Sequence, residues 1–545
     1  MKKRLISIIS LMLVLVMVLA MAVACKKNDP VIPDDDDGDG DGNGGGGTGG
    51  GEEVTAWYDD VKFTDTELVI QLSNCTKDTE LPVGGDKYMK GPDAIDSTGA
   101  NSLGAVENEV YKRNRAAVQN FGFTLKYVYC DKEWNYVRSY IAEQENNYGS
   151  SEKVDLYCDM LYDMEACAVE NGIFANLLKY TAKDSGVDGW EAGAGFFDIA
   201  PKNGYNVNFM DDMALSENRK VLIASDYFMD VLRAMTMMPF NKDIYTGVVA
   251  VDDPDAERLY QMALDGQWTW DALMSFQDVA TSEGASTLDD DRILIPLACG
   301  GLTASALLYS TAFEGYTERV VGDTTYYKLE NSCNKLVQLF QKAGQLAGCF
   351  GVVVVGGSDV QSVETANAKF TSGESLFATP NMLGIVESDA FQEMSGLSIM
   401  PVPMLDDQSE SCTMINSRAR VGALSFHSTK KAAMSAFVQY SSEKSETVKN
   451  KYFDTAMKGQ FLVGSNAGQI LTKIYTDLGN GKYAILENLI LAKDWNVGKE
   501  NCWTQLLKQE NFTKYASQIT TKYSACINAK QAILDGVSES WANAQ

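Results

Sequence analysis

The sequence predicts an α/β fold with mainly parallel sheets, and three observations support this expectation. Between residues 66 and 172, short apolar runs alternate with segments of helical periodicity in the order strand, helix, strand, helix, strand. A second series of such runs occupies residues 220–402. About 490 residues follow the polar N-terminal segment, which is enough chain to bury two cores of ordinary domain size.

In the first region we expect three strands, with a helix after each. The predicted strands are residues 66–72, 123–129 and 154–160. The predicted helices are residues 106–121, 134–145 and 161–172. Val106, Val110, Ala117 and Phe121 form the apolar face of the first helix, and Gly122 after them suits a left-handed C-cap.

The second region is predicted to alternate in the same way. Strands are expected at residues 220–225, 293–298, 375–379 and 397–402. Helices are expected at residues 256–264, 270–281 and 333–346, and over most of the chain after residue 429. Residues 317–321 and 324–328 flank Gly322 and Asp323, a spacing that indicates a β-hairpin.

The N-terminal segment, residues 1–24, has the pattern of a secretory signal peptide. Three basic residues precede an apolar run to Ala24, which ends in small residues directly before Cys25. A cysteine in this place resembles the bacterial lipoprotein signal, in which that cysteine is acylated and becomes the new N-terminus. The alternative is a transmembrane anchor, since about 20 apolar residues can span a bilayer. We expect a protein lipid-anchored to the cell membrane through Cys25 and facing outside the cytoplasm.

Residues 25–55 are predicted to form a flexible tether, because their acidic and glycine-rich composition offers almost nothing to bury. The Asp-Gly alternation from Asp37 to Gly42 also resembles the start of a calcium loop. Counted from Asp37, the twelfth position is not the glutamate that such a loop needs. Counted from Asp41 it is Glu52, but Gly45 then occupies a ligand position.

Charge excludes some partners. Removal of residues 1–24 takes away three basic and no acidic residues, which brings the formal net charge from −28 to −31. Nucleic acid and anionic lipid surfaces both attract cations, so we expect neither as a partner. The membrane is reached only through the lipid anchor.

Cysteine and histidine usage argues against a metal site and against common catalytic mechanisms. The chain has eleven cysteines but no CxxC pair, and most are expected to be small buried apolar residues. His427 is the only histidine. We expect it on the surface at the entrance of a helix that begins near Ala432, with Ser428 or Thr429 as the N-cap, rather than as a general base. No phosphate-binding glycine loop is present, so we expect no enzyme activity and no cofactor.

Four short motifs occur in a characteristic order. They are Phe-Asn-Lys-Asp at residues 240–243, Gly-Gln-Trp-Thr-Trp-Asp-Ala-Leu at 266–273, Phe-Thr-Ser-Gly-Glu-Ser-Leu-Phe at 370–377 and Leu-Ser-Ile-Met-Pro-Val-Pro at 397–403. Behind a lipoprotein-type signal, this order resembles the extracellular solute-binding proteins of ABC importers, in the carbohydrate-type group that includes the maltose-binding protein. The chain departs from that group at Phe240, where relatives have a tyrosine that can face the ligand.

These motifs also have local physical roles. Thr269 is a plausible N-cap, and Asp271 lies in the first helical turn, where a carboxylate interacts favourably with the helix dipole. Gly373 supplies a turn before a strand, and Trp268 and Trp270 are expected to pack at the helix start.

The resemblance implies a two-lobed periplasmic-binding-protein-like fold, each lobe a mainly parallel sheet flanked by helices, with the ligand in a cleft between the lobes. The expected lobes are residues 56–235 with 395–455, and residues 236–394 with 456–545. The resemblance further implies a monomer that delivers a small molecule, a carbohydrate and specifically an oligosaccharide, to ABC permease subunits.

Candidate ligand contacts are polar or aromatic residues in loops or just after predicted strands. They are Asn101, Tyr162, Asp163, Trp190, Asp226, Tyr227, Tyr316 and Asn381. Sugar binding requires flat apolar faces that stack on pyranose rings and planar polar groups that bond to hydroxyls. Trp190 lies in a turn-rich segment and is expected to stack, whereas Asp226 and Asn381 follow predicted strands and offer a carboxylate and an amide.

Other functions stay open on sequence grounds. A peptide or a polyamine could replace the sugar, since the acid-rich chain would suit a polycation. A surface glycoside hydrolase would need paired carboxylates at a defined separation, and the abundant acidic residues permit such a pair. A polysaccharide-adhesion module without a transporter is a further alternative.

We predict that Cys25→Ala abolishes lipid attachment, because the thiol is the acylation site. The variant should lose metabolic labelling with a fatty acid and leave the membrane fraction. A variant that stays as labelled and as membrane-bound as the parent would show that Cys25 is not the attachment point.

Overall fold

The fold is taken from a computed structural model of the chain. It describes residues 61–73, 88–92, 102–130, 136–148, 153–168, 172–180, 197–214, 219–280, 292–298, 316–321, 324–329, 334–356, 359–406, 413–416, 418–457, 465–479, 483–485, 496–497 and 500–501. These residues all lie within one compact unit, residues 56–545. Among the described helices, none combines the length and apolarity needed to cross a bilayer.

A four-stranded sheet in the order β12-β3-β1-β2 organises the first part of the fold, called lobe 1 here. Its strands are β1 (Glu67–Ser73), β2 (Thr124–Cys130), β3 (Leu156–Met160) and β12 (Arg420–Leu424). β1 pairs in parallel with β2 and β3, and β12 is antiparallel to β3. The strand-helix alternation predicted for residues 66–172 is therefore confirmed, and so is the α/β class.

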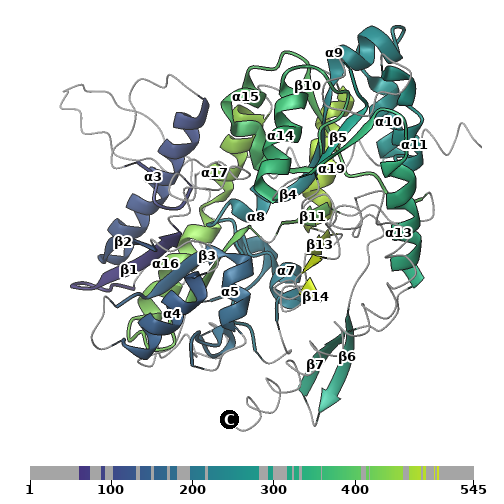
Figure 1. Cartoon of the computed structure of the whole chain (residues 1–545). Coiled ribbons are helices and arrows are strands. Elements are labelled where there is room, and N and C mark those ends of the chain that lie inside the picture. The colour runs from purple at the N-terminus through teal and green to yellow at the C-terminus, as the bar shows by residue number, and fades with distance from the viewer. Residues whose placement is uncertain are drawn as a thin grey trace, which may run out of the picture. The chain divides into compact units, whose positions relative to one another are not determined.

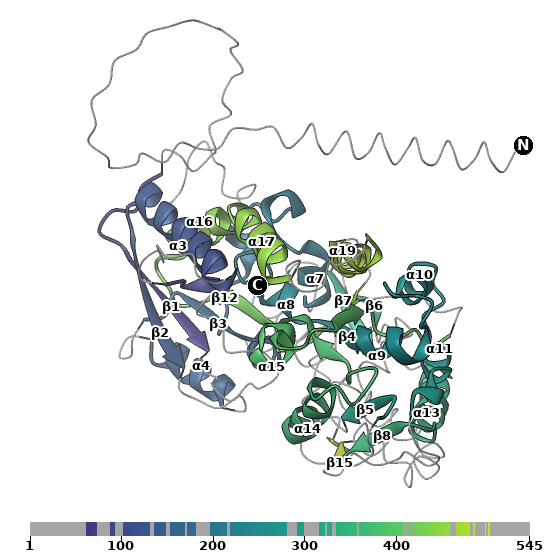
Figure 2. The same ribbon diagram turned by 90° about the horizontal axis from the view of Figure 1, so that it is seen from above.

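Helices cover this sheet. They are α3 (Ser102–Phe121), α4 (Val137–Asn146), α5 (Leu161–Ala168), α16 (Lys431–Glu443) and α17 (Glu446–Lys451). α3 packs against α16 and α17, whereas α5 packs against α4, β3 and β12. Figure 2 shows the strands of this sheet between α3 and α4. Shorter helical segments in this part of the chain are η1 (Leu177–Tyr180), η3 (Pro201–Asn203), α7 (Val207–Asp212) and α8 (Asp230–Arg233).

Strand β4 (Met235–Asn241) is buried along its whole length and links the two parts of the fold (Figure 1). Its first residues pair with β9 (Asn381–Met382) and β11 (Thr413–Ile415), and its last four pair with β10 (Leu397–Met400), in each case antiparallel. β13 (Tyr483–Ile485) extends this sheet beside β11. β10 belongs to residues 395–455, which the sequence assigned to lobe 1. It pairs with β4 residues 238–241, which the sequence assigned to lobe 2.

The second part of the fold, called lobe 2, contains β5 (Ile295–Ala298) parallel to β8 (Val352–Val355). Its helical segments are α9 (Lys242–Ile244), η4 (Tyr245–Val249), α10 (Glu257–Leu264), α11 (Trp270–Met274), η5 (Gln277–Val279), α13 (Asn334–Ala347), α14 (Asp359–Thr371), η6 (Leu383–Glu387) and α15 (Asp389–Gln392). Further segments are α19 (Ser465–Gly479), β14 (Asn496–Val497) and β15 (Glu500–Asn501), whereas η7 (Tyr452–Met457) packs against α3 and α17 of lobe 1. The predicted hairpin is confirmed as β6 (Tyr316–Val321) and β7 (Thr324–Leu329).

The local roles expected at the helix start are confirmed. Thr269 is the N-cap of α11, and its Oγ1 accepts a hydrogen bond from the Ala272 amide at 3.1 Å. Trp268 and Trp270 are buried, and the Trp268 indole donates to the Pro401 carbonyl at 2.8 Å. Gly373 has a φ of 80°, as the expected turn requires.

Three local predictions differ from the structure. Residues 220–225 and 375–379 form isolated bridges rather than ladders. The helix predicted at 270–281 breaks after Met274 into a short 3-10 turn. The N-cap of α16 is Lys430, and no side chain caps the helix; the Ser428 hydroxyl, two residues earlier, donates to the buried Asp155 carboxylate at 2.6 Å and accepts from the Lys430 amide at 3.0 Å. Secondary-structure propensity cannot predict that residues 220–225 and 375–379 form only isolated bridges. It also cannot predict that the Asp155 carboxylate lies beside Ser428.

The described cysteines and the histidine lie where the sequence places them. Cys130, Cys158 and Cys167 are free and buried, and Cys349 is partly exposed. The side chain of His427 is 45% exposed, and its Nδ1 lies 2.9 Å from a carboxylate oxygen of the buried Glu145.

We predict that Gly422→Ala destabilises lobe 1 by about 1–3 kcal/mol, because overpacking of a dense core displaces its neighbours. Gly422 lies in β12, and a Cβ there would overlap the Phe228 ring, with Cε1 at 2.9 Å. Gly356→Ala is the matched control, since a Cβ at Gly356 meets nothing within 4 Å. Urea unfolding of both variants checks this, and equal midpoints would contradict the packing described.

Candidate functional site

The carboxyl ends of the parallel strands are where a ligand site is expected in α/β sheets. In lobe 1, β3 ends at Met160, which pairs with Arg420 at the start of β12. In lobe 2, β5 ends at Ala298, whose amide donates to Thr379 Oγ1 at 3.3 Å. β4 connects the two edges, because Met237 pairs with Asn381, two residues after Thr379.

The lobe 1 edge contains a buried amide and a buried carboxylate. Gln71 Nε2 donates to Asp159 Oδ2 at 3.2 Å, and the Met160 amide donates to Asp159 Oδ1 at 2.8 Å. Gln71 and Asp159 are both 0% exposed. Gln71 Oε1 accepts no hydrogen bond from the described residues. Asp163, predicted as a ligand contact, is buried nearby in the first turn of α5.

The lobe 2 edge contains Asn381, whose amide orientation is set by its neighbours. Nδ2 donates to Asn367 Oδ1 at 2.8 Å and to the Thr379 carbonyl at 3.0 Å. A flipped amide would place an oxygen against two acceptors, so this orientation is the one that the hydrogen bonds allow. Oδ1 of this fully buried side chain receives no hydrogen bond within the described ranges.

Thr236 lies on β4 next to this edge. It pairs with Met382 on one side and Met414 on the other, and it is 2% exposed. No described residue bonds to its Oγ1. Gln71, Thr236 and Asn381 thus each carry a buried oxygen that no described residue bonds, and such an oxygen is costly unless a donor reaches it.

A buried ionic network joins segments from both lobes next to β4. The fully buried Arg233 guanidinium bonds to Glu387 through Nε at 2.8 Å and to Asp230 through Nη1 at 2.8 Å. Arg420 Nη1 bonds to the second oxygen of Asp230 at 2.7 Å. We call these four residues the Arg233 network. It contains two positive and two negative charges, so it is neutral as a unit.

Two tyrosines complete the coordination of Glu387. Tyr452 donates to Oε1 at 2.7 Å and Tyr88 donates to Oε2 at 2.9 Å. Burial first, and then the Glu387 carboxylate, raises the pKa of each tyrosine well above its usual range, so both keep their protons and act as donors. The Arg233 guanidinium also lies 4.5 Å from the centre of the Tyr88 ring.

Asp226, a predicted ligand contact, is engaged by the chain itself. Its Oδ2 lies 2.6 Å from Lys449 Nζ, and Lys449 lies 5.4 Å from the centre of the Tyr475 ring. Burial, the largest single effect, lowers the pKa of Lys449, but the Asp226 carboxylate and Tyr475 together outweigh it and raise that pKa to about 12. The ammonium is therefore charged at neutral pH and occupies one oxygen of Asp226.

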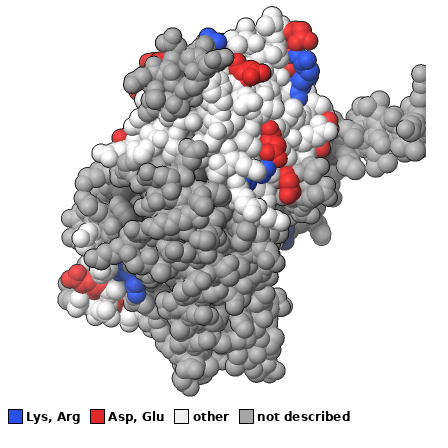
Figure 3. Space-filling model, turned by 45° about the vertical axis from the view of Figure 1, so that its right-hand side comes forward, with Lys and Arg blue, Asp and Glu red and all other residues white. Residues whose placement is uncertain are grey.

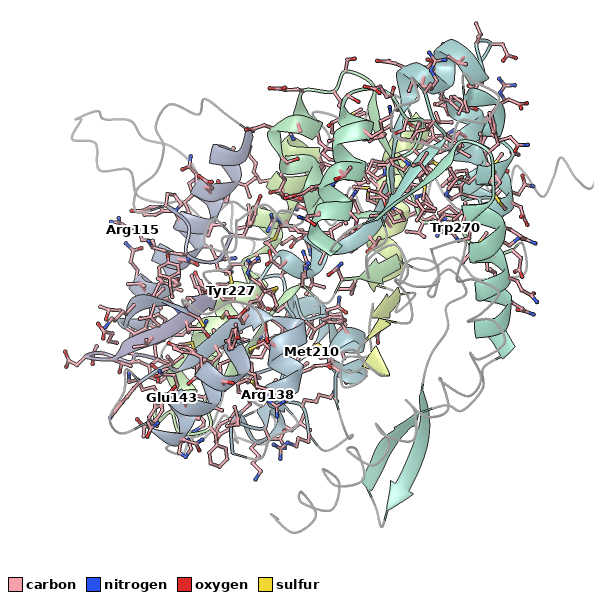
Figure 4. The ribbon with its side chains drawn as sticks, viewed as in Figure 1. Arg115, Arg138, Glu143, Met210, Tyr227 and Trp270 are labelled. Atoms are coloured by element: carbon pink, nitrogen blue, oxygen red, sulfur yellow. The ribbon has the colours of Figure 1, made fainter. Side chains whose placement is uncertain are left out.

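Tyr227, the neighbouring candidate, lies in the core of lobe 1 (Figure 4). Its ring is 4.6 Å from the guanidinium of Arg113 and packs edge-on against Phe437. Among the residues that the structure describes, Arg113 has only neutral partners, including Ser445 Oγ at 2.7 Å and the Tyr88 carbonyl at 3.1 Å. Burial lowers the pKa of Arg113 to about 10, which leaves it charged at neutral pH.

The remaining candidates fall outside this description. Cys25, Asn101 and Trp190 are not among the described residues, and Tyr162 and Tyr316 lie in α5 and β6 with side chains that are not described. The structure thus brings Asp163 and Asn381 to the carboxyl ends of the two sheets. Sequence reasoning missed Gln71 and Thr236, although each is a lone polar residue inside an apolar strand, which is a usable signal.

The described surface carries no large field of one sign on the face in Figure 3, where acidic and basic side chains lie close to each other. Within the described ranges, no group of three or more His, Cys, Asp or Glu side chains is arranged to hold a metal ion.

No protein-family model matches the chain, and no curated protein matches it. Among solved structures, it is similar to the GacH receptor of Streptomyces glaucescens GLA.O, which was studied unliganded and with acarbose and an acarbose homolog. That similarity has a TM-score of 0.46 at 11% identity, covering 87% of this chain and 99% of the receptor. An ABC transporter solute-binding protein from Agrobacterium radiobacter K84, in complex with ribitol, gives a TM-score of 0.45 at 9% identity, covering 86% of this chain and 98% of that protein. At this level of similarity, function has to be argued from the chain's own residues.

We predict that Glu387→Gln lowers the free energy of unfolding by about 3–5 kcal/mol. The substitution removes one of the two carboxylates that pair with the buried Arg233 guanidinium and leaves only Asp230. Glu109→Gln is the control, since the Glu109–Lys112 pair lies on the surface of α3 and contributes little. Denaturant unfolding at neutral pH measures both. Equal losses in the two variants would mean that the Arg233 network is not a structural requirement.

Proposed function

We propose that this chain is the extracellular, lipid-anchored solute-binding component of an ABC importer, and that its ligand is a carbohydrate, specifically an oligosaccharide. The observation that carries the proposal is the set of unbonded, buried oxygens of Gln71, Thr236 and Asn381 at or beside the carboxyl ends of two α/β sheets. A small molecule rich in hydroxyls, held between the lobes, would supply the donors that these oxygens lack.

A binding role is favoured over catalysis by the state of three acids, of which Asp230 and Glu387 have buried side chains and Asp226 is partly exposed. Asp230 and Glu387 are held by arginines, and Asp226 is held by Lys449. A glycoside hydrolase needs one carboxyl group free to donate a proton and a second free to act as base or nucleophile. Carboxylates that are occupied by cations of the same chain are poorly suited to either task.

The same pairing weakens the case for a polycation as ligand. A polyamine or a basic peptide would require carboxylates that are available to it, and the three acids above already have cationic partners. The net charge of the chain still favours a cation at long range. The rival ligand classes are therefore separate arms of the experiment below.

Attachment to the membrane is proposed from the N-terminal segment, and delivery to a permease from the resemblance to solute-binding proteins. A lipid on Cys25 and a polar spacer up to residue 55 would leave the folded unit free to meet membrane-embedded subunits. Ligand-driven closure of hinged lobes is the conformational change that such a role requires.

We predict that a neutral oligosaccharide raises the melting temperature of the full-length, detergent-solubilised protein, because a ligand that binds only the folded state stabilises it by mass action. A ligand at 100 times its Kd adds about 2.7 kcal/mol. The screen compares oligosaccharides, peptides and polyamines. A shift with peptides or polyamines alone would reject the carbohydrate and leave a solute-binding role in place.

Variants locate the site in the same assay. Asn381→Ala should weaken binding roughly tenfold to a hundredfold, since a buried hydrogen bond is worth about 1–3 kcal/mol, and Trp190→Ala should act similarly through lost stacking. Asn147→Ala is the matched control, because Asn147 is exposed at the end of α4. Affinities that match the parent in both test variants would place the site elsewhere.

A further inference from the structure

We infer that the Glu387 carboxylate is the pivot of the hinge between the lobes: it holds the lobe 1 ends of the connecting segments together, and lobe 2 turns about that point. The inference goes beyond the identity of the ligand, and it takes from the proposed function only that the lobes are hinged. The place of the Arg233 network in the chain, and the lobe that supplies each of its groups, support it.

Three stretches of described chain connect lobe 1 with the sheet of β4. Arg233 is the last residue of α8, shortly before β4 begins. Arg420 is the first residue of β12, which follows β11. Tyr452 is the first residue of η7, which follows α17 and leads toward α19, a helix packed against β10 and β11. Each of these connections therefore has, at its lobe 1 end, a residue that bonds to Glu387 or, for Arg420, to Asp230.

The Glu387 carboxylate accepts four hydrogen bonds from described residues of lobe 1. Oε1 accepts from Arg233 Nε at 2.8 Å and from the Tyr452 hydroxyl at 2.7 Å. Oε2 accepts from Arg233 Nη2 at 3.1 Å and from the Tyr88 hydroxyl at 2.9 Å. The side chains of Arg233 and Glu387 are 0% and 5% exposed. Both oxygens of one buried carboxylate thus hold donors from separate segments of lobe 1.

Glu387 itself belongs to lobe 2. It ends η6, and α15 follows directly. The centre of the Phe391 ring in α15 lies 5.7 Å from that of Phe370 in α14, and α14 packs against β5. Tyr88, in contrast, is fixed to α3, because its carbonyl accepts a hydrogen bond from Arg113 Nη2 at 3.1 Å. One lobe therefore supplies the acceptor and the other supplies the donors.

The burial of this contact suits a pivot rather than a latch that opens. A latch breaks and forms again, and breaking this contact would leave a guanidinium and a carboxylate unpaired in buried surroundings, which is strongly unfavourable. Hinge motion in proteins is absorbed by a few residues in loops or at the ends of elements. The contact therefore stays intact while the lobes reorient, and the change in backbone angles falls on the connecting segments outside it.

The test measures the spread of lobe orientations in the full-length, detergent-solubilised protein without any ligand. Genetically encoded spin-labelled amino acids, which leave the native cysteines unlabelled, replace Glu143 of α4 and Glu364 of α14, both of which are exposed. Double electron–electron resonance then gives the distribution of distances between the lobes. A second labelled pair, Glu143 and the exposed Arg115 of α3, gives a distance within lobe 1 (Figure 4).

The test variant combines Tyr88→Phe with Tyr452→Phe. It removes two donors to Glu387 and keeps both rings, which pack edge-on with their centres 5.9 Å apart. The distribution between the lobes should become roughly 1.5 times as broad, since a less constrained pivot populates more orientations. The distance within lobe 1 should not change. If circular dichroism shows that the double variant does not fold, Tyr452→Phe alone is judged by the same criterion.

The matched control combines Tyr157→Phe with Tyr260→Phe. These hydroxyls are also buried and hydrogen-bonded, but each bond lies within one lobe. Tyr157 of β3 donates to Glu145 of α4 at 2.8 Å, and the hydroxyls of Tyr260 in α10 and Ser398 in β10 lie 2.5 Å apart. The control should therefore keep the width of the parent distribution.

Broadening that is confined to the test variant, with the distance within lobe 1 unchanged, supports the pivot. A test variant with the parent width overturns the inference. Equal broadening in the control also overturns it, because lost hydrogen bonds would then act wherever they lie. A ligand screen without any shift in melting temperature would reject the proposed function and leave the pivot in place, so the two can fail separately.

Discussion

The buried guanidinium of Arg233 is the interaction on which the meeting of the two lobes depends. It is fully buried and is bonded by Asp230 and Glu387, and Asp230 is bonded in turn by Arg420. These residues come from α8, η6 and β12, segments that are far apart in the sequence. A charge in this environment is stable only while all partners are present, so the network requires that these three segments meet in one arrangement.

The network also explains why β4 can carry polar side chains through a buried sheet. Arg233 is followed after one residue by Met235, where β4 begins, and Thr236 and the paired Asn381 lie directly beyond. The charges of the Arg233 network neutralise each other, and the network lies before β4 in the chain. The Thr236 hydroxyl and the Asn381 amide are therefore buried without a net charge beside them, in surroundings of low dielectric constant. In such surroundings a hydrogen bond from a ligand is stronger than in water. The Arg233 network thus lies directly before the strand that carries Thr236.

Part of the candidate site was predictable and part was not. Asp163 lies just after β3, as expected from a polar residue after an apolar run, whereas Asn381, expected after a strand at residues 375–379, is itself the first residue of β9. The contact of either residue with a ligand stays a prediction. Asp226 follows the same rule, yet its carboxylate is bonded by Lys449, which is 223 residues away in the chain. Local pattern cannot detect a partner at that distance. Gln71 and Thr236 are polar residues between apolar neighbours in their strands. This pattern can be recognised in the sequence, but it does not show which groups surround the two side chains.

The sequence by itself determined the α/β class, most helix and strand positions and the cap at Thr269, because these depend on periodicity and on side chains within one or two turns. It also determined the expectation of a signal peptide and a lipid anchor, which are read from order and composition alone. The tertiary structure decided which strands pair, that residues 220–225 and 375–379 form only bridges, and which charges are compensated. Those outcomes depend on contacts between distant segments, where burial makes the free energy of a polar group depend on neighbours that no local pattern specifies.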